Sequence, residues 1–316
     1  MAGSSKKVII AALLGNTLIA LTKFVAAALT NSSAMLSEGI HSLVDTGNQI
    51  LLLYGLKRAQ KPADEMFPFG HGKEVYFWSF VVAIMVFAVG AGVSVYEGVI
   101  RLREPEPVAN VLINYVVLGL ALVFEGGAWF FALREFSHQK GKVSYMQAVQ
   151  RGKDPSIFVV LFEDSAAMLG LVVALVATLL GQVTGNLYFD GAASIVIGLI
   201  LGGTAIWLAY ETKGLLIGER ARGEVIDGIR AIVLAVADVK HVNEIATMHM
   251  GPDFVLANLS LDFVDDIPSQ AVEYTITQIT SQIKQQFPVV KRVFIEIESW
   301  HNHTPGSGTV PSKNPA

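Results

Sequence analysis

A run of 22 residues without a charge, VYFWSFVVAIMVFAVGAGVSVY, extends from Val75 to Tyr96. A second stretch, Ser165 to Tyr210, carries only one charge, Asp190. A helix needs about 20 apolar residues to cross the hydrocarbon core of a bilayer. The two stretches therefore predict a polytopic membrane protein.

The composition of the 316 residues agrees with this prediction and excludes several classes of protein. Charged residues make up 16% and hydrophobic residues 52%, whereas an average soluble domain is about 25% charged. The net charge is −4 and the sequence has no basic stripe, so we expect no nucleic-acid partner. The absence of cysteine excludes disulfides, thiolate metal sites, cysteine nucleophiles and iron–sulfur clusters.

Six apolar segments predict a six-helix transmembrane domain over residues 1–213. We place the helices at about 8–29, 34–57, 75–100, 111–134, 156–181 and 189–213. Eleven lysines and arginines lie on one side of the predicted membrane, and only Arg101 and Arg103 lie on the other. The positive-inside rule then places both termini and the 135–155 loop in the cytoplasm.

From residue 214 the sequence changes to that of a soluble α+β domain. Residues 224–237 and 269–287 have helical spacing, and residues 242–250, 254–264 and 293–297 have the pattern of strands. The order αββαβ predicts a small cytoplasmic domain over 214–303, with one sheet and its helices on one face. Residues 304–316 are rich in Pro, Gly and Ser and predict a disordered tail.

Two pairs of ionisable residues lie deep in the predicted helices, where each buried charge costs about 2.5–3.5 kcal/mol. His41 and Asp45 are four residues apart and therefore share one face of the second helix. Asp45 lies roughly 16 Å from the outer end of that helix, close to the bilayer midplane. Glu163 and Asp164 lie about two turns into the fifth helix. Burial at this depth requires an explanation for each pair.

One histidine and two or three carboxylates can bind a divalent cation with mixed nitrogen and oxygen ligands. The alternative is a set of interhelical hydrogen bonds or a His–Asp ion pair. Because Glu163 and Asp164 point about 100° apart, Asp164 is the preferred ligand and Glu163 is a ligand, a supporting group or a proton carrier. Asn48, one turn beyond Asp45, is an oxygen ligand or an ordinary hydrogen-bonding group.

Three further membrane charges have simpler interpretations. Lys23 lies near the outer end of the first helix, where we expect its ammonium to reach the interface. Glu125 in the fourth helix faces a cavity or pairs with a neighbouring helix. Asp190 begins the sixth helix, where capping of that helix accounts for it.

Two groups of polar residues outside the membrane are weaker metal-site candidates. Asp64 and His71 lie in the loop after the second helix and are a possible second ion site or part of an ordinary turn-rich loop. In the soluble domain, a metal role and a solvated strand face with a flexible tail remain alternatives. The candidates there are Glu296, Glu298, His301 and His249.

Two motifs resemble the cation diffusion facilitator family of proton-coupled divalent-metal exporters. They are TNSSAMLSEGIHSLVD, from Thr30 to Asp45, and FGHGKE, from Phe69 to Glu74. The resemblance covers about residues 25–300 and includes the six helices and the αββαβ order. It implies a homodimer with a metallochaperone-like, ferredoxin-like cytoplasmic domain.

The resemblance also implies a transport site between the second and fifth helices of each protomer. Its helix-two ligand pair corresponds to His41 and Asp45, and its second helix-five ligand to Asp164. The first helix-five ligand of the family corresponds to Val160, which cannot bind metal. The sequence is similar to a branch of the family with a Glu-Asp pair in this helix, which implies that Glu163 replaces the missing ligand. The loop ligands match Asp64 and His71, but another falls on Phe67, and the cytoplasmic sites are matched in part by Glu296 and Glu298.

The leading hypothesis is export of a divalent cation from the cytoplasm, with protons as the counter-ion and the bacterial inner membrane as its location. We expect Zn²⁺ as the transported ion, because a histidine ligand disfavours Mg²⁺ and Ca²⁺ and the absence of thiolates disfavours Cu(I). Mn²⁺, Fe²⁺, Co²⁺ and Ni²⁺ remain alternatives, as does a membrane-bound metal sensor. An intramembrane hydrolase is disfavoured because the chain has no His-Glu-x-x-His and no Gly-x-Ser-x-Gly motif.

Overall fold

The computed structural model describes residues 2–108, 110–140, 144–145, 148–149, 152–301 and 303. It divides into two compact units, Met1–Leu216 and Ile217–Ala316. The predicted tail, residues 304–316, lies outside the described residues.

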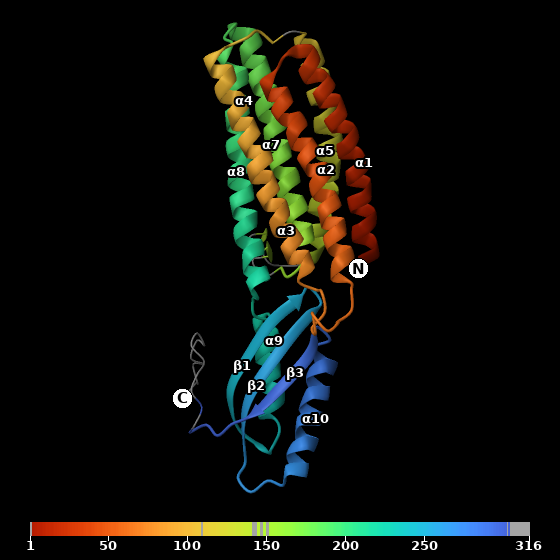
Figure 1. Ribbon diagram of the computed structural model, residues 1–316, viewed down its shortest axis with the longest axis vertical. Coiled ribbons are helices and arrows are strands. Elements are labelled where there is room, and N and C mark those ends of the chain that lie inside the picture. Colours follow the sequence, from red (N-terminus) through yellow and green to blue (C-terminus); the bar gives the residue numbers. More distant parts are fainter. Residues whose placement is uncertain are drawn as a thin grey trace. The chain divides into compact units, whose positions relative to one another are not determined.

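The first unit is a bundle of long helices (Figure 1). Among the described residues these are α1 (Ala2–Thr30), α2 (Ser33–Ala59), α5 (Val111–Lys140), α7 (Pro155–Thr184), α8 (Tyr188–Ile217) and a composite third helix. The composite helix consists of α3 (Glu74–Met85), a π-helical turn η1 (Val86–Ala91) and α4 (Gly92–Arg103). Each predicted span falls inside one of these helices. Most of the helices extend beyond the predicted span by only a few residues at each end.

Four helices in the described part of the chain are long and apolar enough to cross a membrane: Glu74–Arg103, Val111–Ser137, Phe158–Thr184 and Tyr188–Ile217. In α1, the part of the helix with described side chains contains the apolar segment Gly15–Thr30. Helix α2 contains charged and amide side chains along its buried face, which lower its hydropathy. The structure therefore confirms a helical membrane domain, with α2 as its most polar long helix.

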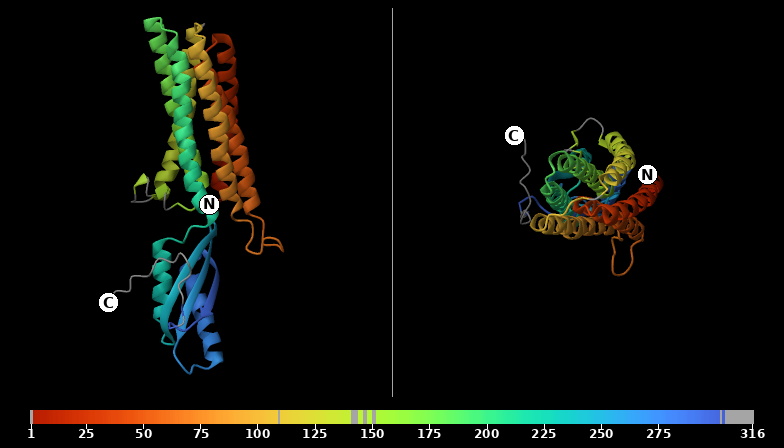
Figure 2. Two further views of the ribbon diagram at one scale, coloured as in Figure 1. Left: turned by 60° about the vertical axis from the view of Figure 1, so that its left-hand side comes forward. Right: turned by 90° about the horizontal axis from the view of Figure 1, so that it is seen from above.

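Helix α2 is packed by helices on several sides, which explains how it can hold polar side chains away from lipid. It contacts α1, α3, α4 and α7, and the view from above shows the helices grouped as a bundle (Figure 2). Residues on the outside of the bundle are large and apolar, as expected for a lipid-facing surface. Examples are Leu21, Val123, Phe124, Leu199 and Ile206.

Small residues allow α4 and α8 to approach closely. A β-carbon at Gly98 of α4 would lie 2.7 Å from the carbonyl oxygen of Gly191, and one at Gly198 would lie 3.0 Å from that of Ala91. Close backbone approach through glycine is a common way for membrane helices to pack. It fixes α8 against α4, and α4 also contacts α2.

The second unit is an α+β domain with the predicted order αββαβ. Its elements are α9 (Gly223–Leu234), β1 (Val239–Gly251), β2 (Phe254–Phe263), α10 (Ser269–Gln286) and β3 (Val290–Ile297). The sheet order is β1-β2-β3; β1 pairs with β2 antiparallel, and β3 pairs with β2 parallel. Alternate β2 residues face Ile229 and Val233 of α9 and Ile279 and Ile283 of α10 in one core. The predicted sheet with helices on one face is confirmed.

Candidate metal site

Helix α2 presents a continuous polar face to the interior of the bundle. Glu38, His41, Asp45 and Asn48 recur every three or four residues, Ser37 lies four residues before His41, and each of the five is at most 4% exposed. That spacing places the side chains one above another on one side of a helix. The face therefore lines α2 over about three turns inside the membrane domain.

His41 and Asp45 form the centre of this face. His41 Nε2 lies 3.4 Å from Asp45 Oδ2, as the four-residue spacing predicts. Among the described residues, neither ring nitrogen of His41 has a hydrogen-bond partner, and Asp45 Oδ1 has none. Buried polar atoms are normally paired, so this pair presents uncommitted nitrogen and oxygen donors to the interior.

Helix α7 supplies acidic side chains that face the same region. Asn48 Nδ2 donates a hydrogen bond to Glu163 Oε1, and the carboxyl groups of Glu163 and Asp45 are within hydrogen-bonding reach of each other. Asp164 is half-buried, and its charge acts on Asp45. The structure thus brings Glu163 directly against the α2 face, and Asn48 is the group that holds it there.

These side chains do not form a closed ligand cage. Within the described ranges, no group of three histidine, aspartate or glutamate side chains is arranged to hold a metal ion. His41 and Asp45 are carried by α2, whereas Glu163 and Asp164 are carried by α7. A bound cation would therefore draw together donors from two helices, and their metal role stays a prediction.

Lys23 is part of a buried ion cluster and does not reach the interface, so the expectation of a snorkelling side chain is wrong. Its side chain is fully buried, and Nζ donates to Glu38 Oε2 at 3.0 Å, Glu125 Oε1 at 2.8 Å and Ser42 Oγ at 2.9 Å. All three ammonium donors are used. Glu125 therefore pairs with a neighbouring helix, one of the two interpretations that its position allowed.

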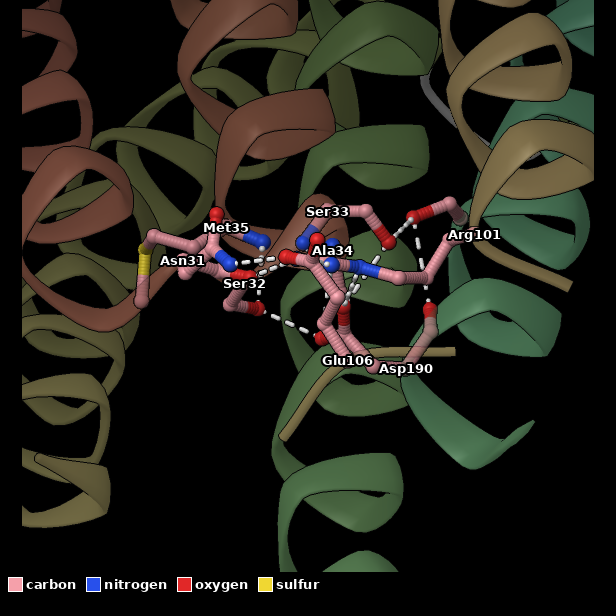
Figure 3. A network of polar contacts seen from close by, with 9 residues as sticks. Asn31, Ser32, Ser33, Ala34, Met35, Arg101, Glu106 and Asp190 are labelled. Atoms are coloured by element: carbon pink, nitrogen blue, oxygen red, sulfur yellow. Dashed lines mark hydrogen bonds and ion pairs between the residues drawn. The ribbon is translucent and has the colours of Figure 1, made fainter. Parts of the chain in front are cut away.

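The carboxylate of Asp190 caps the start of α2, whereas the sequence assigned it to the start of its own helix (Figure 3). Its carboxylate accepts from Ser33 N at 2.6 Å, Ala34 N at 3.4 Å, Ser32 Oγ at 2.5 Å and Ser33 Oγ at 2.8 Å. Arg101 of α4 lies 3.7 Å away through Nε. A carboxylate is favoured at a helix N-terminus by the exposed amides and the helix dipole. This contact anchors the helix that carries His41 and Asp45.

Arg101 extends this contact around the first interhelical turn. It donates to Glu106 at 2.8 Å and to the carbonyl oxygen of Asn31, and Asn31 also donates to Glu106. These hydrogen bonds hold the pKa of Glu106 below its usual value. The α1–α2 turn, α4 and α8 are thus joined at one end of the bundle (Figure 3).

The structure brings the loop candidates Asp64 and His71 together. Asp64 Oδ2 lies 2.9 Å from His71 Nε2, and this hydrogen bond is the main reason that the pKa of Asp64 is below its usual value. Phe67, which falls at a family ligand position, packs its ring against His71. Glu74 lies 3.8 Å from His71 Nδ1 but is already bound by Arg58. The two predicted donors are adjacent, and their metal role stays a prediction.

The cytoplasmic candidates do not gather at one point. Glu298 accepts from Ser260 and contacts His303 Nδ1 at 2.6 Å, and the histidine keeps the pKa of Glu298 below its usual value. Glu296 and His301 are exposed. His249 is buried opposite Val255, several strand positions from the Ser260 end of the sheet. The sheet register, which the sequence could not supply, separates His249 from the others.

Two sequence signals for the membrane site were not used in the prediction. Glu38 lies three residues before His41, so the same helical spacing places it on the polar face. Lys23 required a partner because its charge lies inside an apolar helix. Its acidic partner Glu125 is 102 residues away in the chain, and no local pattern connects the two.

Comparison with known families gives two matches that together cover most of the chain. Residues 9–217 match the family described as the cation efflux transmembrane domain. Residues 221–300 match the cytoplasmic domain of cation efflux proteins. The first match contains the whole polar face of α2 and the acidic pair of α7.

Several characterised proteins are similar in sequence. The proton-coupled zinc antiporter SLC30A9, mitochondrial, of Xenopus laevis is 34% identical over 81% of this chain and 46% of its own length. Its Homo sapiens counterpart is 31% identical over 90% of this chain and 50% of its own length. The manganese efflux system protein MneP of Bacillus subtilis is 22% identical over 94% of this chain and 96% of its own length. The chain spans about half the length of the zinc antiporters that it matches.

Proposed function

The chain belongs to the cation efflux family, a family of transporters and not of enzymes, and on that premise we propose that it exports Zn²⁺ from the cytoplasm in exchange for protons. The transported ion is the cargo of the α2–α7 site. The proposal specifies three things beyond the family: the ion, the ligands and the counter-ion.

The observation that carries the proposal is the set of uncommitted polar atoms on the buried face of α2. In the described part of the chain, Ser37 Oγ, Glu38 Oε1, both His41 nitrogens, Asp45 Oδ1 and Gln49 Oε1 are buried without hydrogen-bond partners. Each such atom inside a membrane carries a desolvation cost that a structural role alone does not offset. At His41 and Asp45, a passing cation offsets that cost by binding to the ring nitrogen and the carboxylate oxygen.

The donor types favour a borderline divalent metal. One imidazole together with carboxylates is a common ligand set for Zn²⁺. We assign His41, Asp45 and Asp164 as ligands, with Glu163 as the replacement for the ligand position occupied by Val160. The contact between Glu163 and Asn48 supports this assignment, because the carboxylate already points toward α2. The named zinc antiporters, at 31–34% identity, support the same ion.

Mn²⁺ is the second candidate, and the oxygen content of the site favours it. The proposed donor set combines three carboxylates and the Asn48 amide with one imidazole, and oxygen-rich sites suit Mn²⁺ better than soft metals. MneP, whose name gives manganese efflux, is similar over nearly its whole length. Fe²⁺, Co²⁺ and Ni²⁺ are tested by the same competition experiment.

Proton exchange follows from the chemistry of the proposed ligands. Imidazole and carboxylate bind a metal only when deprotonated, so loading releases protons and unloading takes them up. Because His41 and Asp45 belong to α2 while Asp164 and Glu163 belong to α7, relative movement of the two helices alternately assembles and opens the site. A cation and protons then occupy the same donors at different stages of one cycle.

The remaining parts of the proposal concern assembly and orientation. We assign a homodimer, because residues 221–300 match the cytoplasmic domain of a family in which that domain is linked to dimerisation. The distribution of lysine and arginine supports cytoplasmic termini. Asp64 with His71, whose side chains are in contact, is assigned as an auxiliary metal site.

Reconstitution of the full chain into sealed liposomes tests the proposal. Uptake of Zn²⁺ is measured with an indicator in the lumen, and each of Mn²⁺, Fe²⁺, Co²⁺ and Ni²⁺ is added as a competitor. We expect Zn²⁺ uptake that depends on a proton gradient and on Asp45. Preferential uptake of Mn²⁺ would favour the second candidate, whereas metal binding without any flux would favour a sensor.

A further inference from the structure

The buried Lys23 cluster contains one more negative charge than positive charge. One ammonium, that of Lys23, faces two carboxylates, Glu38 and Glu125. Lys23 is fully buried, Glu38 is fully buried and Glu125 is 8% exposed. An unbalanced charge is strongly disfavoured in a low-dielectric interior, where groups take up or lose protons to become neutral. As a set, the three side chains therefore lack one positive charge.

In the part of the chain that the structure describes, the two carboxylates of the cluster also have free oxygen atoms that can take up the missing positive charge as a proton. Among the described residues, Glu38 Oε1 and Glu125 Oε2 are buried and have no hydrogen-bond partner, whereas the other oxygen of each carboxylate receives the ammonium. Ser42 takes the third ammonium donor, so Lys23 has none left to offer. Each free oxygen can accept a proton without breaking an existing contact.

The cluster lies close to the transport site but is separate from it. Glu38 and Asp45 are seven residues apart on α2, and Gly170 and Glu163 are seven residues apart on α7. Asp45 meets Glu163, and a β-carbon at Gly170 would overlap Glu38 Oε1. Seven residues correspond to about two turns, or roughly 10 Å, along a helix, whereas His41, the nearest proposed ligand, lies three residues or roughly 4.5 Å along α2 from Glu38. The same pair of helices thus carries the cluster and the metal site at two levels.

Charges at the two levels influence each other. The charge of Lys23 acts on His41, and the charge of Glu125 acts on both Asp45 and Asp164. Among the described residues, the cluster joins Lys23 of α1, Glu38 of α2 and Glu125 of α5, and the nearby titratable groups are the proposed ligands His41 and Asp45 on α2 and Glu163 and Asp164 on α7. A divalent cation arriving among the ligands repels any further positive charge at this range in a low-dielectric medium.

We propose that Glu38 and Glu125 share one exchangeable proton beside Lys23, and that metal binding at the His41–Asp45 site expels it. The O–H bond of one carboxylic acid breaks, the proton passes to water, and the carboxylate left behind stays paired with the Lys23 ammonium. When the metal leaves, a proton from water restores the acid. This assigns one coupling proton to groups that do not bind the metal, and it rests on the proposed proton-coupled export.

The test counts protons released when Zn²⁺ binds to the purified full chain in detergent. Calorimetry in buffers of different ionisation enthalpy gives that number, and the slope of log affinity against pH gives it independently. Glu125→Gln and Glu38→Gln each neutralise the surplus charge without removing a metal ligand. We expect each variant to bind as many Zn²⁺ ions as the wild type, to release one proton fewer per ion, and to show a pH slope lower by one.

Two further variants separate this inference from a structural role. Lys23→Met leaves two acids without an ammonium, so we expect it to release one proton more than the wild type. Glu97→Gln is the matched control, since Glu97 is a half-buried membrane glutamate outside the cluster, and we expect the wild-type proton count. A wild-type count in both Glu38→Gln and Glu125→Gln would overturn the proposal while leaving metal export intact. A wild-type chain that binds no divalent transition metal would overturn the proposed function and this inference together.

Discussion

Replacement of Asp190 by alanine is expected to destabilise the membrane domain through α2. The carboxylate accepts four hydrogen bonds at the start of α2, two from backbone amides and two from the hydroxyl groups of Ser32 and Ser33. Hydrogen bonds inside membrane helices contribute about 0.6 kcal/mol each, which gives roughly 2.4 kcal/mol for four. The buried hydroxyls then lose their acceptor, which raises the expected loss to about 3–4 kcal/mol.

The conservative variant Asp190→Asn refines this prediction. An amide keeps one acceptor oxygen but loses the second oxygen and the negative charge that favours a helix N-terminus. We expect a loss of about 1–2 kcal/mol, or roughly half of the alanine effect.

The assay is unfolding of the purified protein in mixed micelles by denaturing detergent, with helix content as the signal. Glu104→Gln is the control, because Glu104 is exposed near the same end of the bundle, and its effect should stay within about 0.5 kcal/mol. Equal midpoints for wild type and Asp190→Ala would refute the assignment of Asp190 as the anchor of α2.

Other predictions address the site and its surroundings. Asp45→Ala and Asp164→Ala should each abolish metal flux in liposomes while the purified protein keeps its helix content, because removing a buried acid also removes a burial cost; near-normal flux in either would contradict the ligand assignment. Glu163→Gln should weaken metal binding about 10–100-fold if Glu163 only supports a ligand. If Glu163 is itself a ligand, the substitution should weaken binding further and change the preference among metals. Unchanged binding in calorimetry would show that Glu163 has a structural role only. The pKa of Glu106 is held low by Arg101, so Glu106 should stabilise the folded protein above its ordinary pKa of 4.5, and this stabilisation should be lost as the pH falls below that value. In Glu106→Gln, the corresponding decrease of the unfolding midpoint at acidic pH should disappear.

Local periodicity was sufficient to predict much of this molecule. The four-residue spacing of His41 and Asp45 places them in contact at 3.4 Å, and apolar run length predicted the long helices to within a few residues in most cases. The αββαβ order followed from strand alternation and helical spacing in the same way. These are properties of neighbouring residues in one element.

Features that depend on partners far along the chain were not predictable. The burial of Lys23 depends on Glu125 of another helix. Asp190 was correctly linked to a helix N-terminus, but the helix that it caps begins 157 residues earlier in the chain. The separation of His249 from Glu298 depends on the register of the sheet. In each case the decisive contact is tertiary, and a single sequence does not encode it in a local pattern.

The central claim is that one set of buried donors binds either a metal or protons. The most direct measurement is Zn²⁺ flux in sealed vesicles containing the full chain, with a proton gradient first imposed and then collapsed by an ionophore. We predict flux that follows the gradient, metal affinity that falls with decreasing pH because protons compete for the same donors, and a weaker pH dependence in His41→Asn. Flux that ignores the gradient, with affinity unchanged between about pH 5 and 8, would contradict the account.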